Sequence, residues 1–306
     1  SNPGFSGNET FSYKASDGTN ESEVGQISID VVEKESSLNW SRFFSSSNVN
    51  SSINDDSGNT YMAGRFYEYS NFKDNTTLNA IYAQSDDGYI AKYNSSGELL
   101  WVNTFGGTNA DYAYDIKMDS DGNIIVAGTI QRTATFSDGE ELGDPDVAVQ
   151  NNYGIALKLN GNTGDIIWKT NTNEQVYSRN RLSLTDDGRI IMIINTGSWN
   201  DSNGLKIIEF NGNDGSFEIV ATDYGFADLV HDVITDNNNN IYLSGLTYNG
   251  TQYIGKLIRY NSNYNKDWEI DLNGNYATIR SLVYDPVNNL LYCTGEAKGS
   301  NMNPLG

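Results

Sequence analysis

Apolar and polar side chains alternate along most of this chain in short runs that recur in a fixed order. In the fullest copy, residues 114–118 alternate, residues 119–123 read Asp-Ser-Asp-Gly-Asn, and residues 124–128 are apolar. A further alternation at residues 155–160 and a Thr-Gly turn then lead to Trp168. A period of two predicts β-strands, and Asp, Gly and Asn between them predict tight turns. Each copy therefore predicts four short strands.

This unit repeats through most of the chain. Its last strand carries a tryptophan or a substitute, at Trp40, Trp101, Trp168, Ile219 and Trp268. Repeats of four short strands without helical periodicity predict an all-β fold, a β-propeller of four-stranded antiparallel blades. We expect full blades near residues 41–101, 102–168, 169–219 and 220–268, and a partial blade at 269–306. The strand at residues 38–43 is expected to complete the last blade, and the ring to be completed by sequence outside this segment.

The first residues have a different character. Residues 10–15 and 25–32 alternate on either side of a polar turn, which predicts a pair of strands. A lone pair of strands is marginally stable, so we expect it to end a β-sandwich. We therefore divide the chain into residues 1–34, which include a polar linker, and the propeller at residues 35–306.

Two resemblances follow from these motifs. The motifs Phe-Gly-Gly, Asp-x-Asp-Gly-Asn, Ala-Gly, Lys-x-Asn and Gly-x-x-x-Trp make the repeat similar to the bacterial β-propeller repeat family, over most of the chain. The run from Gly4-Phe5-Ser6-Gly7 to Val32 resembles the last strands of bacterial Ig-like and cadherin-like modules. The resemblance implies a prokaryotic cell-surface, extracellular protein. Residues 163–168, Thr-Gly-x-x-x-Trp, are also similar to quinone-dependent dehydrogenase propellers, which supports the fold and not the activity.

Charge and composition restrict the partners. Forty Asp and Glu against 19 Lys and Arg give a net charge of −21, which argues against nucleic acid as a partner. No apolar run reaches 18 residues, so we expect no insertion into a membrane. A single cysteine, Cys293, rules out an intrachain disulfide framework, and we expect it to be a small buried apolar side chain.

Candidate chemistry in the repeat is explained by the scaffold. Asp119, Asp121 and Asn123 resemble part of a calcium loop, yet the equivalent turn in another copy reads Asp-Asn-Asn-Asn-Asn. We therefore interpret these runs as turns, with Ca²⁺ as the weaker alternative, and predict no cofactor or metal site. His231 is the single histidine and is assigned a structural role. We predict no catalytic residue and no enzymatic activity.

The loops between the second and third strands are the candidate interaction sites, because they emerge on one face of the blades. Aromatic residues beside acids suit carbohydrate stacking or a protein interface. The candidates are Phe66, Tyr67, Tyr69, Phe72, Tyr82, Asp138, Glu140, Glu141, Asp144 and Asp146.

These features predict a non-enzymatic surface or filament protein whose propeller is a structural and adhesive platform. Its expected partners are proteins or carbohydrates at the loop face, with self-assembly in a larger surface structure as a further expectation. One alternative is a propeller enzyme of the quinone-dehydrogenase, lyase or hydrolase type with an axial active site. A single histidine and few arginines argue against that alternative. A third is a polymer subunit joined by strand addition.

Overall fold

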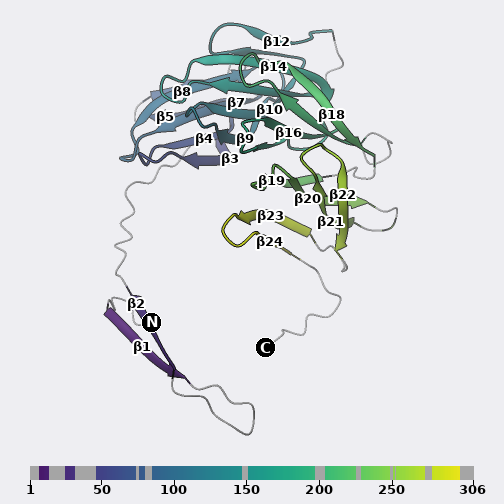
Figure 1. The fold of residues 1–306 in the computed structure, drawn as a ribbon. Helices are drawn as coiled ribbons and strands as arrows, with labels where there is room; N and C mark the ends of the chain where they lie inside the picture. The colour runs from purple at the N-terminus through teal and green to yellow at the C-terminus, as the bar shows by residue number, and fades with distance from the viewer. Residues whose placement is uncertain are drawn as a thin grey trace. The chain divides into compact units, whose positions relative to one another are not determined.

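The computed structural model describes residues 7–13, 25–31, 46–73, 76–79, 85–146, 151–196, 204–224, 229–248, 251, 253–272 and 278–296. The chain divides into two compact units, Ser1–Ser41 and Arg42–Gly306. All regular elements in these ranges are β-strands (Figure 1). None of the described segments forms a helix that would cross a membrane.

The first unit contains one antiparallel pair. Strand β1 (Gly7–Tyr13) pairs with β2 (Gly25–Val31), and Phe11 lies opposite Ile27. The alternation seen in the sequence therefore corresponds to paired strands. Whether this pair belongs to an Ig-like module stays a prediction.

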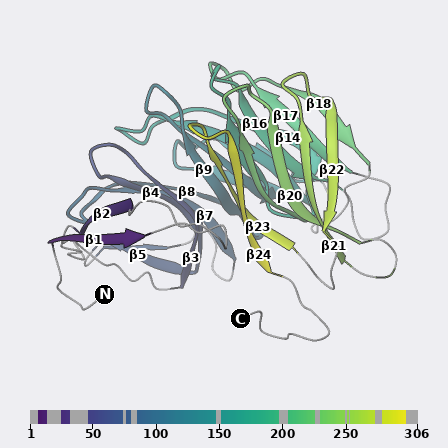
Figure 2. The same cartoon turned by 60° about the horizontal axis from the view of Figure 1, so that its bottom comes forward.

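The second unit is a β-propeller, as the repeat predicts. Each of its first four blades has four antiparallel strands in sequence order from the inner strand to the outer strand. Blade 1 contains β3 (Ser47–Asn54), β4 (Thr60–Tyr67), β7 (Asp86–Tyr93) and β8 (Leu99–Gly106), and blade 2 contains β9 (Tyr112–Met118), β10 (Ile124–Gln131), β13 (Asn152–Leu159) and β14 (Ile166–Gln175). Blade 3 contains β15 (Arg181–Leu184), β16 (Ile190–Asn195), β17 (Leu205–Phe210) and β18 (Phe217–Asp223), and blade 4 contains β19 (Leu229–Thr235), β20 (Ile241–Tyr248), β21 (Tyr253–Tyr260) and β22 (Lys266–Leu272). Blade 5 contributes β23 (Thr278–Asp285) and β24 (Leu290–Glu296) (Figure 2).

The core lies between successive blades. In β10, Ile124 and Val126 pack with residues of blade 1, whereas Ile125 and Ala127 pack with residues of blade 3. Because successive side chains of a strand point to opposite faces, a strand covered on both faces is apolar throughout. This explains why the second strand of each unit reads as a continuous apolar run. Inner strands β3, β9, β15, β19 and β23 contact one another in this order.

The tryptophans of the repeat join each blade to the next. The indole Nε1 of Trp101 donates to the carbonyl oxygen of Gly161 at 3.3 Å, and that of Trp168 donates to Gly212 at 3.0 Å. A Cβ added to Gly215, at φ 73°, would lie 2.6 Å from the Trp168 ring. The glycine-bearing turns of blades 2 and 3 therefore pack against the tryptophan of the preceding blade.

The Asp-rich turns are closed by their own carboxylates. Asp119 Oδ1 accepts hydrogen bonds from the backbone N–H groups of Asp121 and Asn123, at 3.0 and 2.8 Å. Gly122 takes a positive φ of 77°, and Asn239 takes φ 60° at the same place in blade 4. Asn tolerates this left-handed conformation better than most residues, so an Asn-only copy still turns. These contacts support the interpretation of the runs as turns.

Aspartates at the inner strands make a second connection between blades. Asp115 Oδ2 accepts from the backbone N–H of Leu182 in blade 3, at 2.9 Å. Asp232 Oδ2 accepts from the N–H of Leu282 in blade 5, at 2.8 Å. Each carboxylate thereby satisfies a backbone donor of the following blade close to the axis.

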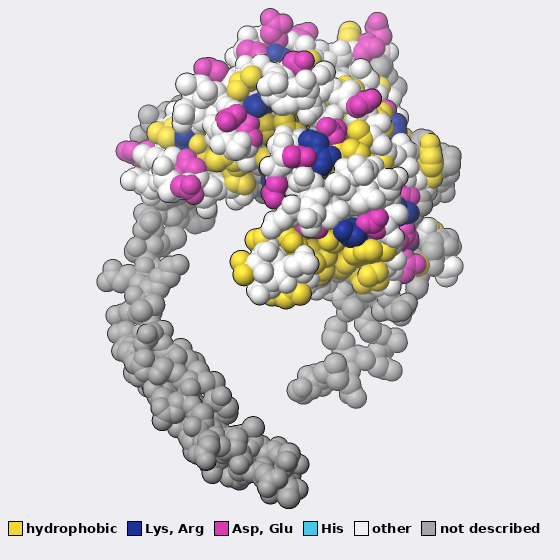
Figure 3. Space-filling model, viewed as in Figure 1, with side chains coloured by type: hydrophobic (Ala, Val, Ile, Leu, Met, Phe, Trp, Pro, Cys, Tyr) yellow, Lys and Arg dark blue, Asp and Glu magenta, His cyan; other side chains and the backbone are white. Residues whose placement is uncertain are grey.

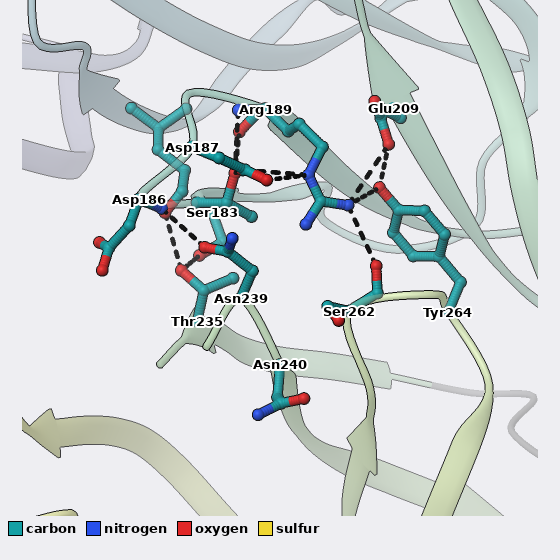
Figure 4. A network of polar contacts seen from close by, with 12 residues as sticks. Ser183, Asp186, Asp187, Arg189, Glu209, Thr235, Asn239, Asn240, Ser262 and Tyr264 are labelled. Carbon is teal, nitrogen blue, oxygen red and sulfur yellow. Dashed lines mark hydrogen bonds and ion pairs between the residues drawn. The ribbon is translucent and has the colours of Figure 1, made fainter. Parts of the chain in front are cut away.

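Blades 3 and 4 are also joined by a polar network (Figure 4). The Arg189 guanidinium donates to Asp187 at 3.0 Å and to the Tyr264 hydroxyl at 2.7 Å. The Tyr264 hydroxyl in turn donates to Glu209. Asn239 Oδ1 accepts from the backbone N–H of Asp186 at 2.9 Å. The charged residues of these turns therefore have a structural role, because they hold blades 3 and 4 together.

Blade 5 exposes apolar side chains. Val283, Leu290 and Tyr292 are 60%, 49% and 52% exposed, and Figure 3 shows hydrophobic side chains gathered at this end of the propeller. Cys293 is exposed as well, contrary to the expectation of a buried thiol, because no described strand pairs with the outer edge of β24. Residues 38–43, expected to complete this blade, lie outside the described residues.

Candidate functional site

The insertion in blade 1 folds onto the blade. It forms the hairpin β5 (Tyr69–Lys73) and β6 (Thr76–Asn79). Phe66 and Phe72 are buried, and the Phe72 ring centroid lies 4.7 Å from that of Tyr89. The Tyr93 hydroxyl donates to the carbonyl oxygen of Phe72 at 2.7 Å. The expectation that these two phenylalanines face solvent is thus corrected: their rings stabilise the blade.

The structure places the other aromatic candidates of blade 1 only in part. Tyr67 ends β4 and is 40% exposed. Tyr69 begins β5. Tyr82 lies outside the described residues. Of the predicted aromatic surface, Tyr67 is therefore the side chain that the structure places in contact with solvent.

The insertion in blade 2 is a hairpin that pairs with blade 1. Strands β11 (Thr133–Phe136) and β12 (Glu141–Gly143) extend the sheet of blade 1 to six strands, with Phe136 opposite Phe105 in the ladder. The two rings stack with centroids 5.1 Å apart. This insertion, expected from the sequence to be a free loop, therefore links blade 2 to the sheet of blade 1.

The five acidic candidates all belong to this hairpin and its ends, and all are exposed: Asp138, Glu140, Glu141, Asp144 and Asp146. Asp138 forms an ion pair of 2.5 Å with Lys169 of blade 2, and Asp144 accepts from the backbone N–H of Asp146 at 2.9 Å. Among the described residues, no three His, Cys, Asp or Glu side chains gather as metal ligands. The role of this acidic surface in interactions stays a prediction.

A different set of residues marks the centre of the same face. In four inner strands the ladder skips one residue: Asn50 in β3, Tyr114 in β9, His231 in β19 and Arg280 in β23. Such a β-bulge re-aims the side chain of the extra residue, and bulges occur preferentially beside functional sites. The bulge occupies the same place in these four blades, but the side chains differ in chemistry. The scaffold therefore presents variable side chains at a constant position.

Two of the bulged residues line one pocket. This pocket, which we call the axial pocket, measures about 400 Å³ and is lined by Arg179, Arg181, Leu229, Val230, His231 and Arg280. It lies at the first residues of the inner strands β15, β19 and β23, where the blade-to-blade connections enter. It therefore opens on the loop face that the sequence identified as the functional side.

The arginines of the axial pocket are poorly neutralised. Among the described residues, neither Arg179 nor Arg181 forms an ion pair, and Arg181 Nε is buried without a hydrogen-bond partner. The Arg179 guanidinium lies 6.0 Å from the centroid of the Tyr114 ring. Arg280 pairs with Glu296 at 2.7 Å. Of the three arginines, Arg280 is thus the one with an ion pair among the described residues.

The imidazole of His231 presents an unprotonated nitrogen. Its Nδ1 lies 2.9 Å from the carbonyl oxygen of Ile279, which accepts only, so the hydrogen-bond network assigns the proton to Nδ1. Nε2 then accepts from Arg280 Nη1 at 3.2 Å. Burial lowers the pKa of His231, the Ile279 hydrogen bond opposes this, and the charges of Arg280 and Arg181 lower it further. The ring is therefore neutral at pH 7.

Comparison with known proteins concerns the fold. No family model and no curated protein matches the sequence. Among solved structures, the chain is similar to regucalcin, a calcium-binding protein from Agrobacterium tumefaciens, at 11% identity over 75% of this chain and 76% of that chain, with a TM-score of 0.39. It is similar to quinohemoprotein alcohol dehydrogenase from Comamonas testosteroni, at 10% identity over 76% and 47%, with a TM-score of 0.41. It is also similar to a rhamnogalacturonan lyase from Bacillus licheniformis, at 11% identity over 94% and 63%, with a TM-score of 0.42.

These findings correct the expectation that the chain is not an enzyme. Two of these three structures carry the names of enzymes, so a fold of this kind gives no ground for excluding an activity. The sequence argument against an axial site rested on a single histidine and few arginines. The structure places that histidine, His231, with three arginines in the same pocket.

Proposed function

We propose that the axial pocket binds an anionic ligand, and that the ligand is a carbohydrate bearing carboxylates. The observation that carries this proposal is the gathering of Arg179, Arg181, Arg280 and His231 in one pocket of a chain with a net charge of −21. Guanidinium groups bind carboxylates through two parallel hydrogen bonds, which makes arginine the preferred residue for this task. Arg179 itself packs over the ring of Tyr114, which is stacked on Tyr112 outside the pocket lining.

The setting that we propose is the cell surface. The similarity of the repeat motifs to bacterial propeller repeats of surface proteins supports this setting, where carboxylate-bearing polymers are available to the loop face. The identity of the ligand in the axial pocket bears on both the proposed location and the proposed partner. A test of ligand class is therefore the first experiment.

The ligand class is tested by isothermal titration with a short oligomer of a uronic acid and with its methyl ester. We expect the acid form to bind at one site per chain and the ester to bind at least tenfold more weakly, because esterification removes the charge that the arginines recognise. Added salt is expected to weaken binding of the acid form. Equal affinity for acid and ester would contradict the proposal.

A second candidate function is proton transfer on the bound anion, and the unprotonated Nε2 of His231 favours it. When guanidinium groups hold a carboxylate, the C–H bond on the carbon next to it becomes more acidic. The guanidinium groups stabilise the negative charge that develops on the carboxylate as the proton leaves. Once the bound carboxylate takes over the Arg280 guanidinium, the freed Nε2 takes this proton. The C–H electron pair forms a C=C bond, the adjacent C–O bond breaks with its electrons on the leaving oxygen, and that oxygen takes a proton from the imidazolium Nε2–H or from water. The reaction class is elimination on a uronate polymer.

This candidate predicts the effect of His231→Asn. Asparagine keeps a donor for the Ile279 carbonyl but has no base at the place of Nε2, so we expect the three arginines to retain most of the binding while the unsaturated product, measured by its ultraviolet absorbance, is lost. Because the pKa of His231 is lowered, the wild-type rate should fall only when the pH drops through a value below the ordinary 6.5. A wild type that binds the oligomer but forms no product would restrict the function to binding.

A further inference from the structure

A buried group of oxygen atoms lies where blade 1 is connected to blade 2. Asp87 in β7 and Asp111 just before β9 are both fully buried. The Asp87 carboxylate lies against Gly106, where an added Cβ would be 2.2 Å from Oδ1. The Asp111 carboxylate lies by the backbone N–H of Gly107. Two carboxylates therefore flank the Gly106–Gly107 pair, which leads into the connection.

The hydroxyl of Ser85 is shared among three oxygen acceptors of this group. Ser85 Oγ lies 3.3 Å from Asp87 Oδ1, 3.1 Å from the carbonyl oxygen of Gly107 and 3.0 Å from that of Asn109. A hydroxyl has one proton and donates to one acceptor at a time. At least one of the two backbone carbonyls, of Gly107 or Asn109, is therefore left without a proton from Ser85.

Asp111 provides an independent sign of a missing partner. Its Oδ1 accepts from the backbone N–H of Gln131 at 2.9 Å. Its Oδ2 is buried without a hydrogen-bond partner among the described residues. A buried, unpartnered carboxylate oxygen costs free energy unless a cation or a proton neutralises it. The arrangement thus calls for a cation or for a protonated carboxyl.

The ligand types select the cation. Carboxylates, backbone carbonyls and a hydroxyl are hard oxygen ligands, and there is no histidine or cysteine in this group. Ca²⁺ takes six to eight such oxygens in a flexible geometry, whereas Mg²⁺ requires a near-ideal octahedron and retains its waters. We propose that Asp87, Asp111, Ser85 and the carbonyls of Gly107 and Asn109 form a calcium site that ties the third strand of blade 1 to the connection into blade 2.

The site predicts a calcium-dependent stability. Because Ca²⁺ binds the folded chain, millimolar Ca²⁺ added to EDTA-treated protein should raise the midpoint of thermal unfolding by roughly 5 °C, with a smaller effect of Mg²⁺. Isothermal titration should show one binding event. Asp111→Asn should abolish both the shift and the binding heat. Asp121→Asn, in the exposed turn of blade 2, is the matched control and should leave both unchanged.

Two results would overturn the proposal. The first is a wild-type protein whose unfolding midpoint and titration heat do not respond to Ca²⁺. In that case a proton on Asp111, and not a cation, neutralises the buried carboxylate; burial raises the pKa of Asp111. The other is a calcium response lost in Asp121→Asn and kept in Asp111→Asn. If Asp111→Asn does not fold, Asp87→Asn replaces it, and the wild-type titration decides on its own.

Discussion

Replacing Trp168 by alanine is expected to lower the free energy of unfolding by about 3–5 kcal/mol, the usual cost of truncating a buried tryptophan. The side chain is 6% exposed, and its ring stacks on Phe210 with centroids 6.0 Å apart. Its Nε1 donates to the carbonyl oxygen of Gly212 in the next blade. The substitution therefore removes apolar packing and a hydrogen bond from the joint between blades 2 and 3. Denaturant unfolding followed by tryptophan fluorescence and circular dichroism measures the loss.

The repeat supplies a matched control for this prediction. Ile219 occupies the same repeat position in blade 3 but is 40% exposed. Ile219→Ala should therefore cost about 1 kcal/mol or less, because little apolar surface is lost from contact. A Trp168→Ala protein as stable as Ile219→Ala would contradict the assignment of the tryptophan as the joint between blades.

The second large effect is expected from the double substitution Arg181→Gln and Arg280→Gln. Hydrogen bonds to charged groups contribute about 1.5–3 kcal/mol each, so loss of two guanidinium groups should weaken binding of the uronate oligomer by roughly 100-fold or more. Both variants keep a polar side chain of similar length, and neither residue is part of the apolar core. Isothermal titration measures the affinity, and thermal unfolding checks that the fold is retained.

Arg132→Gln is the control for charge. Arg132 is also an arginine of the loop face, and it donates to the carbonyl oxygen of Pro145 beside a separate pocket. The substitution Arg132→Gln changes the net charge by one unit and leaves the residues of the axial pocket unchanged. An equal loss of affinity in Arg132→Gln would show that the oligomer responds to overall charge or binds at the other pocket.

The fold was predictable because the signals for it are local. The alternation of apolar residues, the Asp-initiated turns and the Gly-x-x-x-Trp run each depend on residues close in sequence, and each is repeated. Trp168 and Gly212 show why these motifs recur together: one blade provides the indole and the next provides its acceptor. Because the repeat encodes both the indole and its acceptor, the contact between neighbouring blades can be predicted from sequence alone.

The errors concern burial, which depends on distant segments. Phe66 lies near the end of β4 and Phe72 in the inserted hairpin, and together they resemble a surface motif, but both rings are buried against the blade. Cys293 lies in an apolar run like those of the other second strands, yet no described third strand covers β24. The same pattern is buried in one blade and exposed in another because the neighbouring strands differ.

The axial pocket could not be predicted from spacing, because Arg181, His231 and Arg280 are far apart in the chain. A usable signal exists all the same. Aligned by repeat, His231 and Arg280 occupy the position of Asn50 and Tyr114, just before the inner-strand alternation. Polar residues of changing type at one repeat position indicate a function separate from the scaffold. The bulge that turns these side chains becomes evident only in the strand register.

An NMR titration of the arginine side chains decides whether the anion binds at the axis. In protein labelled with ¹⁵N-arginine, we expect the uronate oligomer to shift the Nε–H signals of Arg181 and Arg280 and to leave that of Arg132 in place. The assignment of each signal follows from its loss in the corresponding glutamine variant. Shifts confined to Arg132, or binding without any shift at Arg181 and Arg280, would show that the anion does not bind in the axial pocket.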